Sequence, residues 1–349
     1  MKTYVLVDDP EVRPHLLPIT YCRPIAEIRL GITTIREKHE RRLGAKCTWQ
    51  TVEYLQEKYP CRIEGEAEYI PAHVLPGIGE VRHLWDIFQL NGAAIEDDFK
   101  HITAGRKSLP VSPTCTVIGD PSRIFIEEGA SVEGATLNTT KGCIYVGPHA
   151  EVMEGSCLRG PLALCEHSVV NMGAKIYGDT TIGPWCKVGG ELNNVVMQAY
   201  SNKAHDGFLG NAVIGEWCNL GAGCVASNLK NDYSPIKLWN YPAQRFMPTG
   251  LQFCGVIMGD HTKCGINTML NTATVLGVGC NIHGSGFPRP FVPSFSERGG
   301  AGAGYNDVSM TKFFEIAARM MARRHVELTE VDKRIFYAIR DIAENYRFQ

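Results

Sequence analysis

The sequence has no run of lysines and arginines, and its charges nearly balance: 35 basic and 37 acidic side chains give a net charge of −2. A chain without a basic surface stretch is poorly suited to nucleic acid or to a membrane, so we expect a small-molecule ligand instead. The apolar stretch at the N-terminus is short and ends at Asp8 and Asp9. We therefore expect neither a signal peptide nor a membrane anchor.

The thirteen cysteines include no CxxC pair, and their number is odd. A disulfide framework is not expected, and reduced thiols in a cytoplasm fit this composition better. Four histidines (His149, His167, His261 and His283) lack the spacing to acidic or thiol partners that a zinc site needs. The sequence thus predicts a cytoplasmic protein without metal ligands.

What the sequence does contain is an aliphatic residue at every sixth position of a long central stretch. These positions are Val146, Val152, Leu158, Leu164, Val170, Ile176, Ile182 and Val188. The period matches neither an α-helix nor a single β-strand. It fits a coil of short parallel strands, three to a turn, with glycine, asparagine and aspartate at the corners. The repeat predicts a mainly β protein built on a parallel β-helix.

The limits of the repeat divide the chain into three expected parts. Residues 1–110 should form a small α/β segment, residues 111–290 the β-helix, and residues 305–349 a C-terminal helical segment. Thr329 is the expected N-cap of the last helix. Hydrophobic patterns predict a strand at 4–7 and helices at 32–43, 48–58, 81–90, 307–324 and 330–346.

Two stretches inside the predicted coil, 189–208 and 229–250, break the six-residue period. We expect both to bulge from the coil, and loops on a rigid scaffold commonly carry function. The first of them leads into the segment with the clearest chemical pattern. That segment reads HDGFLG from His205, NLGAG from Asn219, and an asparagine at Asn228.

This pattern resembles the acetyltransferase half of the bifunctional N-acetylglucosamine-1-phosphate uridyltransferase/glucosamine-1-phosphate N-acetyltransferase family. Members of that family show His-x-x-Tyr-Leu-Gly, then Asn-Ile-Gly-Ala-Gly, then an asparagine that opens a loop. A wider resemblance, to a divergent bacterial branch with a shortened N-terminal nucleotidyltransferase-like domain, covers nearly all of the chain. It is carried by LLPITYCRPIAEIR, HLWDIFQLNG, RGPLAL, MGAKIYG and GDHTKCGINTMLNT.

The resemblance implies a left-handed β-helix, a homotrimer, and acetyl transfer from acetyl-CoA to an amino-sugar phosphate for cell-envelope precursors. His205 matches the general base, since imidazole titrates near neutrality. Ala222, beside Gly223, matches the position whose amide meets the acetyl-CoA thioester, and a backbone N–H can stabilise the developing oxyanion. Asn228 matches the residue that helps to hold the amino sugar, and Asn219 is included with the substrate-binding residues.

The other candidates align more loosely. Arg159 is the natural candidate for the sugar phosphate, because a guanidinium can bind phosphate bidentately. Lys203 is a second candidate for the phosphate, and Glu191 could meet sugar hydroxyls or the amine. Phe208 stands where the family has a tyrosine, which places the identity of the acceptor in question. The pantetheine arm of the CoA should be bordered by Ile266 and His283.

The start of the chain departs from sugar-phosphate nucleotidyltransferases. Those enzymes follow their first strand with a glycine-rich turn that cradles phosphates. Here the strand runs into Asp8 and Asp9, and no glycine occurs before Gly31. We therefore expect nucleotidyl transfer to be absent or much altered, with Mg²⁺ needed only if it survives. Two alternatives stay open: a sugar-1-phosphate nucleotidyltransferase, and a non-catalytic sugar-nucleotide-binding relative.

Overall fold

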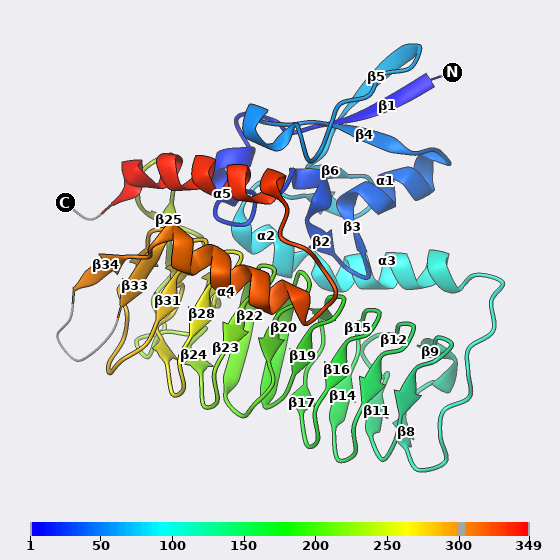
Figure 1. Ribbon diagram of the computed structural model, residues 1–349. Helices are drawn as coiled ribbons and strands as arrows, with labels where there is room; N and C mark the ends of the chain where they lie inside the picture. The colour runs from blue at the N-terminus through cyan, green and yellow to red at the C-terminus, as the bar shows by residue number, and fades with distance from the viewer. Residues whose placement is uncertain (1, 299–303, 348–349) are drawn as a thin grey trace.

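The computed structural model describes residues 2–298 and 304–347, and it is a parallel β-helix with a smaller α/β segment packed along one side (Figure 1). The predicted fold class, mainly β and built on a parallel β-helix, is confirmed. In these two ranges no helix combines the length and the apolar character needed to cross a membrane.

The coil has three faces, numbered here faces 1 to 3, and faces 2 and 3 join through the two long strands β20 and β22. Face 1 contains β10 (Ser131–Val132), β13 (Glu151–Val152), β16 (Val169–Val170), β19 (Lys187–Val188), β21 (Asn202–Lys203), β23 (Asn219–Leu220), β28 (Lys263–Cys264), β31 (Asn281–Ile282) and β33 (Ser296–Arg298), with β34 (Tyr305–Asp307) antiparallel at its edge. Face 2 contains β8 (Thr116–Ile118), β11 (Thr136–Asn138), β14 (Cys157–Arg159), β17 (Lys175–Ile176), the first halves of β20 (Glu191–Met197) and β22 (Phe208–Ile214), β24 (Val225–Ala226) and β29 (Met269–Leu270). Face 3 contains β9 (Ile124–Ile126), β12 (Ile144–Val146), β15 (Leu162–Leu164), β18 (Thr180–Ile182), the second halves of β20 and β22, β27 (Ile257–Met258), β30 (Val275–Leu276) and β32 (Phe291–Val292).

The eight aliphatic residues of the six-residue repeat form the interior of this coil. All eight, from Val146 to Val188, are buried in one core cluster. Each strand contributes one of them, so successive turns stack aliphatic side chains on one another, and burial of this apolar surface stabilises the coil. Coil strands continue to β33, beyond residue 290.

The stretch 189–208 stays in the coil, so the expectation that it bulges out is wrong. It forms β20 and β21, which pair with neighbouring turns on all three faces. The six-residue period is broken because these turns are short: Lys187 pairs with Asn202 and Lys175 with Glu191, advances of 15 and 16 residues. The stretch 229–250 does leave the coil, as the hairpin β25 (Lys237–Asn240) and β26 (Arg245–Pro248).

The front segment centres on a three-stranded parallel sheet with β1 (Lys2–Val7) between β4 (Cys47–Gln50) and β5 (Glu66–Pro71). The helix predicted at 48–58 is therefore wrong. Thr48 and Trp49 pair with β1, since β-branched and aromatic side chains suit a sheet, and only a 3-10 turn, Glu53–Leu55, follows. Two small hairpins accompany the sheet: β2 (Arg29–Leu30) with β3 (Thr33–Thr34), and β6 (Val74–Leu75) with β7 (Gly79–Glu80).

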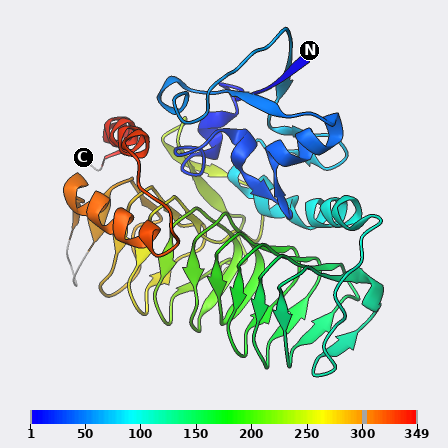
Figure 2. The ribbon, with the colours of Figure 1, turned by 45° about the vertical axis from the view of Figure 1, so that its right-hand side comes forward.

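Helices connect the front segment to face 3 of the coil (Figure 2). They are α2 (Leu84–Gln89) and α3 (Asn91–Thr103), whereas α1 (Ile35–Leu43) packs against β4 and β6 of the front segment. The helix predicted at 32–43 begins at Ile35, where Thr34 forms a capping box with Glu37. The one predicted at 81–90 is α2, whereas α3 was not predicted. Contacts of α2 with β20 and β22, and of α3 with β15 and β18, cover face 3.

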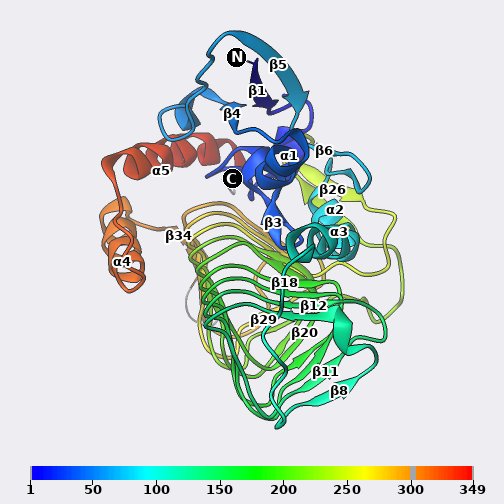
Figure 3. The ribbon, with the colours of Figure 1, turned by 90° about the vertical axis from the view of Figure 1, so that its right-hand side faces the viewer.

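The C-terminal helices are α4 (Met310–Ala322) and α5 (Glu330–Ala343), followed by a 3-10 turn (Glu344–Tyr346). Both predicted C-terminal helices are confirmed. Helix α4 packs beside the late turns of face 1, where Phe313 contacts His261 and Phe295. Helix α5 lies beside the front segment, where Asp332 pairs with Lys58 at 2.8 Å. Figure 3 shows the result along the coil axis: the front segment and these helices leave face 2 uncovered.

We expect Thr329→Ala to lower the free energy of unfolding by about 1 kcal/mol, because Thr329 is the N-cap of α5. Its hydroxyl accepts from the N–H of Asp332 at 3.2 Å, and the Asp332 carboxylate accepts from the N–H of Thr329 at 3.0 Å. Urea unfolding measures the change. Ser309→Ala is the matched control, because Ser309 caps α4 without a side-chain hydrogen bond; an equal loss in both variants would contradict the prediction.

Candidate functional site

His205 lies on an exposed corner between face 1 and face 2. Residues 204–207 form this corner, which joins β21 to β22. The next two turns carry the equivalent corners 221–224 and 265–268, linked by hydrogen bonds from Gly223 N to Asp206 O (3.1 Å) and from Asn267 N to Ala222 O (2.7 Å). The strand register therefore places His205, Ala222 and Ile266 on successive turns. The structure brings these three predicted residues together.

The corner immediately before His205 is two residues shorter than its neighbours. Only Gly189 and Gly190 lie between β19 and β20, whereas 171–174 and 204–207 fill the corners on either side. The Asn171 side chain spans this short corner and donates to Ala204 O at 2.7 Å. Because both residues of the short corner are glycines, the corner itself presents no side chain beside His205, and Asn171 is the side chain that crosses it.

Lys203 lies inside the coil, where its neighbours in the strand register are the inward residues Val188 and Leu220. Its side chain is 0% exposed. The ammonium donates to the backbone carbonyls of His205 and Asp206, the latter at 3.1 Å. Burial lowers the pKa of Lys203, while Asp206 opposes that shift. The structure thus places Lys203 where it holds the corner of His205, and not on the surface where a phosphate would bind.

Asn228 and Phe208 meet over Gly210 at the edge of face 2. A Cβ at Gly210 would lie 2.5 Å from Asn228 Nδ2 and 2.7 Å from Phe208 Cζ, so only glycine fits beneath them. Asn228 Nδ2 donates to Asn211 Oδ1 at 2.8 Å, which fixes the amide. Phe208 is in register with Glu191 on one side and Val225 on the other. Glu191, Phe208 and Asn228 are therefore neighbours.

Arg159 shares face 2 but lies farther away. It is in β14, and β17 and β20 separate that strand from β22. At about 4.8 Å per strand, Arg159 is roughly 14 Å from the strand of Phe208. Lys175, which the sequence analysis missed, is exposed in β17 and directly in register with Glu191. Counting 18 residues per turn could not find it, because the two turns that follow Lys175 are shorter.

The remaining predicted residues lie on other parts of the coil. Asn219 belongs to face 1, where it pairs with Asn202 and Lys263, and so it is not beside Phe208. His283 lies one turn beyond Ile266, against Gly265, with its Nε2 3.5 Å from Glu297 Oε1. Ile266, on the corner 265–268, is the more exposed of these two residues, at 74%.

The two cysteines of the segment are packed inside the coil. Cys218 donates to Gly259 O at 3.2 Å and Cys224 to Gly265 O at 3.0 Å. Burial raises the pKa of Cys218 to about 12 and also raises that of Cys224. A nucleophilic thiol needs a lowered pKa, so neither cysteine has the character of a catalytic residue.

The end of β1 is closed by its own side chains. The Asp8 carboxylate accepts from Arg13 Nη1 (2.6 Å), Thr51 Oγ1 (2.6 Å) and Ile25 N (2.7 Å). Arg13 is 5% exposed. A carboxylate thus occupies the position at which a phosphate cradle would present N–H groups. Across residues 2–298 and 304–347, no group of three His, Cys, Asp or Glu side chains could hold a metal ion.

Comparison with known proteins finds similarity in both parts of the molecule. Residues 4–79 match the family described as sugar nucleotidyl transferase. The bifunctional protein GlmU of Methanocaldococcus jannaschii is 29% identical over 126 residues, which are 36% of this chain and 28% of that protein. GlmU of Acaryochloris marina is 24% identical over 230 residues, 59% of this chain and 43% of that protein. The chain spans less than half the length of these relatives.

Two further matches are a third curated protein and a solved structure. The bifunctional sugar-1-phosphate nucleotidylyltransferase/acetyltransferase of Sulfurisphaera tokodaii is 26% identical over 145 residues, 41% of this chain and 36% of that protein. Among solved structures, a UDP-N-acetylglucosamine acyltransferase covers 69% of this chain and 83% of its own at 16% identity, with a TM-score of 0.27.

Proposed function

We propose, on the premise that the chain is a divergent relative of the bifunctional GlmU proteins, that it is an acetyl-CoA-dependent N-acyltransferase. Its proposed acceptor is an amino-sugar phosphate similar to glucosamine 1-phosphate. One observation carries the proposal: an exposed imidazole, His205, shares a corner edge with the glycine-flanked amide of Ala222 on the next turn.

In this proposal His205 removes a proton from the acceptor amine while the amine nitrogen attacks the thioester carbonyl. The new C–N bond forms, the C–S bond breaks, and the thiolate of CoA takes up the proton. The N–H of Ala222 stabilises the oxyanion between these two events. That N–H has no hydrogen-bond partner in the part of the chain that the structure describes, whereas the N–H of Gly223 is already bonded to Asp206 O.

Acceptor and cosubstrate are proposed to lie on opposite sides of this corner. Glu191, Phe208 and Asn228 line the acceptor side on face 2, with Asn228 oriented by Asn211. Ile266 and His283, on later turns, border the pantetheine arm. The phenyl ring of Phe208 cannot donate a hydrogen bond, so phosphate recognition depends on cations elsewhere on face 2.

The proposal includes a homotrimer. Face 2 is uncovered, and its paired strands β24 and β29 carry apolar side chains that are partly exposed. Val225 is 38% exposed and Met269 is 39% exposed. Packing of such faces against other copies of the chain buries them. It also closes the site around His205, which a single coil leaves open.

A sugar-1-phosphate nucleotidyltransferase is the second candidate, favoured by the match of residues 4–79. The pairing of Asp8 with Arg13 speaks against it. Two assays decide between the activities. Thiol release from acetyl-CoA with a panel of amino-sugar phosphates tests the first, and pyrophosphate release from nucleoside triphosphates with Mg²⁺ and sugar 1-phosphates tests the second. Release of pyrophosphate without thiol would favour the nucleotidyltransferase over the acyltransferase. Release of neither product would favour a non-catalytic binding protein.

We expect Lys175→Gln to raise the KM for the amino-sugar phosphate about tenfold, the equivalent of about 1.4 kcal/mol. Lys175 is exposed and in register with Glu191, two strands from Phe208. Arg159→Gln, three strands from Phe208, should have a smaller effect. Steady-state kinetics at saturating acetyl-CoA compare the two variants, and a larger effect of Arg159→Gln would assign the phosphate to Arg159.

A further inference from the structure

A cavity of about 330 Å³ lies in the front segment, between α1, α3 and the turn that joins β6 to β7. It is separate from the corner of His205. Its helical walls carry three cationic side chains, Lys38, Arg41 and Arg42. None of these residues enters the proposed acyl transfer, and the closed end of β1 at Asp8 is not part of the lining.

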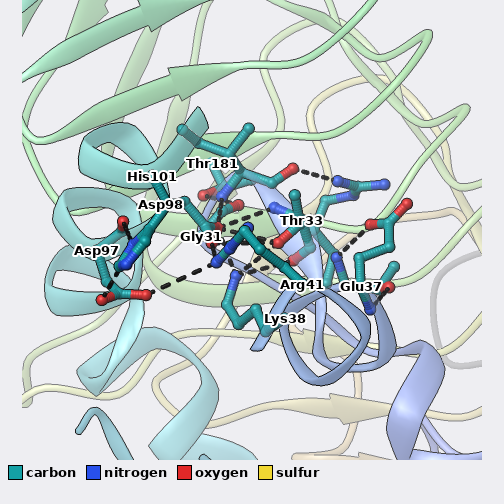
Figure 4. A network of polar contacts seen from close by, with 12 residues as sticks. Gly31, Thr33, Glu37, Lys38, Arg41, Asp97, Asp98, His101 and Thr181 are labelled. Atoms are coloured by element: carbon teal, nitrogen blue, oxygen red, sulfur yellow. Dashed lines mark hydrogen bonds and ion pairs between the residues drawn. The ribbon is translucent and has the colours of Figure 1, made fainter. Parts of the chain in front are cut away.

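Two residues of the lining, Lys38 and Arg41, are held by a network around Asp98, which we call the floor although Asp98 itself does not line the cavity (Figure 4). Asp98 is 0% exposed and accepts from the N–H groups of Ile32 and Thr33 at 2.8 and 3.0 Å. It also accepts from Lys38, and from Arg41 Nη2 at 2.6 Å. Although burial raises the pKa of Asp98, the two cations lower it below its ordinary value, so the carboxylate is ionised. The single negative charge of Asp98 therefore faces two positive charges, those of Lys38 and Arg41.

Counting the remaining charges leaves the cavity basic. The second carboxylate, Asp97, lies 3.7 Å from Arg41 and is the only acidic residue in the lining. Arg42 is exposed and has no ion-pair partner within residues 2–298 and 304–347. His101 Nδ1 donates to Asp97 O at 2.8 Å, so its Nε2 has no partner in the part of the chain that the structure describes and donates to an anion when the ring is protonated. The cavity thus holds one surplus positive charge before any histidine is protonated.

His39, on α1, contributes an imidazole ring to the wall of the cavity. It is 4% exposed. Burial lowers the pKa of His39 and nearby Arg42 lowers it further, whereas hydrogen bonds with the backbone of Ala72 and Val74 only partly oppose the shift. The ring is therefore neutral at pH 7.

The opposite wall is apolar. It consists of Leu75, Pro76 and Ile78, from the β6–β7 hairpin and its turn. A small inorganic anion would leave this wall without contacts, whereas an organic phosphate places a ring or chain against it. Guanidinium groups bind phosphate oxygens bidentately and more strongly than neutral donors do.

We propose that this cavity binds the phosphomonoester of a small organic molecule. The phosphate contacts Arg42 and the Nε2–H of His101 in its protonated form, His39 lies on the polar side, and the organic part packs on Pro76 and Ile78. The floor is already held by Asp98 and by the bond from Gly31 N to Asn91 Oδ1 at 2.7 Å, so binding requires no rearrangement of the helices.

Calorimetric titration of the full chain with inorganic phosphate and with glucose 1-phosphate tests this inference. We expect glucose 1-phosphate to bind more tightly than phosphate, and Arg42→Gln to weaken both at least tenfold. Arg62→Gln is the matched control, because Arg62 is an exposed arginine of the same segment outside the cavity. Lys175→Gln, which removes the cation proposed to hold the acceptor's phosphate on the coil, should leave the affinity for inorganic phosphate unchanged, and this result separates the cavity from the coil.

Three results would overturn the inference: no binding of either probe, equal affinity in the wild type and Arg42→Gln, or equal weakening by Arg62→Gln. The last would indicate only general attraction to positive charge. His101→Gln, a change on the exposed side of α3, should weaken phosphate binding without altering the urea unfolding midpoint. Failure of acyl transfer has no bearing on these binding measurements, so the two proposals can fail separately.

Discussion

His205→Ala is expected to lower the rate of acyl transfer by about 10²–10⁴-fold, the usual contribution of a positioned general base. The imidazole is exposed on its corner, and the adjoining turn presents only Gly189 and Gly190 beside it. The backbone beneath His205 is held by the ammonium of Lys203, so removal of the ring should leave the corner in place. The loss should therefore appear in kcat, with little change in the KM for acetyl-CoA.

Thiol release from acetyl-CoA measures this loss, and two variants control it. His205→Gln keeps a polar side chain of similar length but cannot act as a base near neutrality, so it should be nearly as inactive as His205→Ala. His149→Ala removes another exposed coil histidine, which stacks on His167 at a centroid distance of 5.0 Å; it should retain full activity. Activity within twofold of the wild type in His205→Ala would refute the assignment of the base.

Arg23→Ala should lower the free energy of unfolding by about 3–5 kcal/mol, because it leaves a buried carboxylate without its partner. Arg23 Nη2 lies 2.5 Å from Asp260 Oδ2, and these two side chains are 3% and 4% exposed. Glu216 lies 3.4 Å from the same nitrogen. The pair joins the front segment to a turn of the coil 237 residues later, so its loss weakens both parts together.

Urea unfolding followed by circular dichroism measures this effect. Arg82→Ala is the control, because the pair of Arg82 with Glu80 is about half exposed and such pairs contribute about 0–1 kcal/mol. The double variant Arg23→Met with Asp260→Leu should recover much of the stability, since apolar residues can replace a buried pair. If Arg23→Ala and Arg82→Ala unfold at the same urea concentration, the buried Arg23–Asp260 pair contributes no more to stability than the exposed Arg82–Glu80 pair.

The coil could be predicted from the sequence because its signal is local and repeated. Each aliphatic residue from Val146 to Val188 occupies its own strand, so a missed position would have been visible. The resemblance to the bifunctional family is likewise confirmed by the protein matches. The division at residues 110 and 290, and the roles of the site residues, stay predictions.

Other features depend on contacts that no local pattern contains. The residues after Val188 lose the period through the two-residue corner, so Lys175 and Glu191 could be paired only from the structure. Lys203 lies at an interior position that the repeat normally fills with an aliphatic residue. The backbone carbonyls that accept its hydrogen bonds lie in a turn. The strand at Cys47–Gln50 forms because β1 lies beside it; pairing with a distant strand overrode the helical pattern.

The short corner at Gly189 and Gly190 shows how this architecture tolerates deletions. Every inward aliphatic belongs to its own strand, so residues lost at a bend leave the stacking of the next layer intact, as the continued pairing of β19 with β21 demonstrates. A change in the length of a bend therefore leaves the packing of the interior nearly unchanged but alters the shape of the surface. Substrate range along such an edge can thus be altered by trimming or extending a single bend, while the hydrophobic stack beneath it is unchanged.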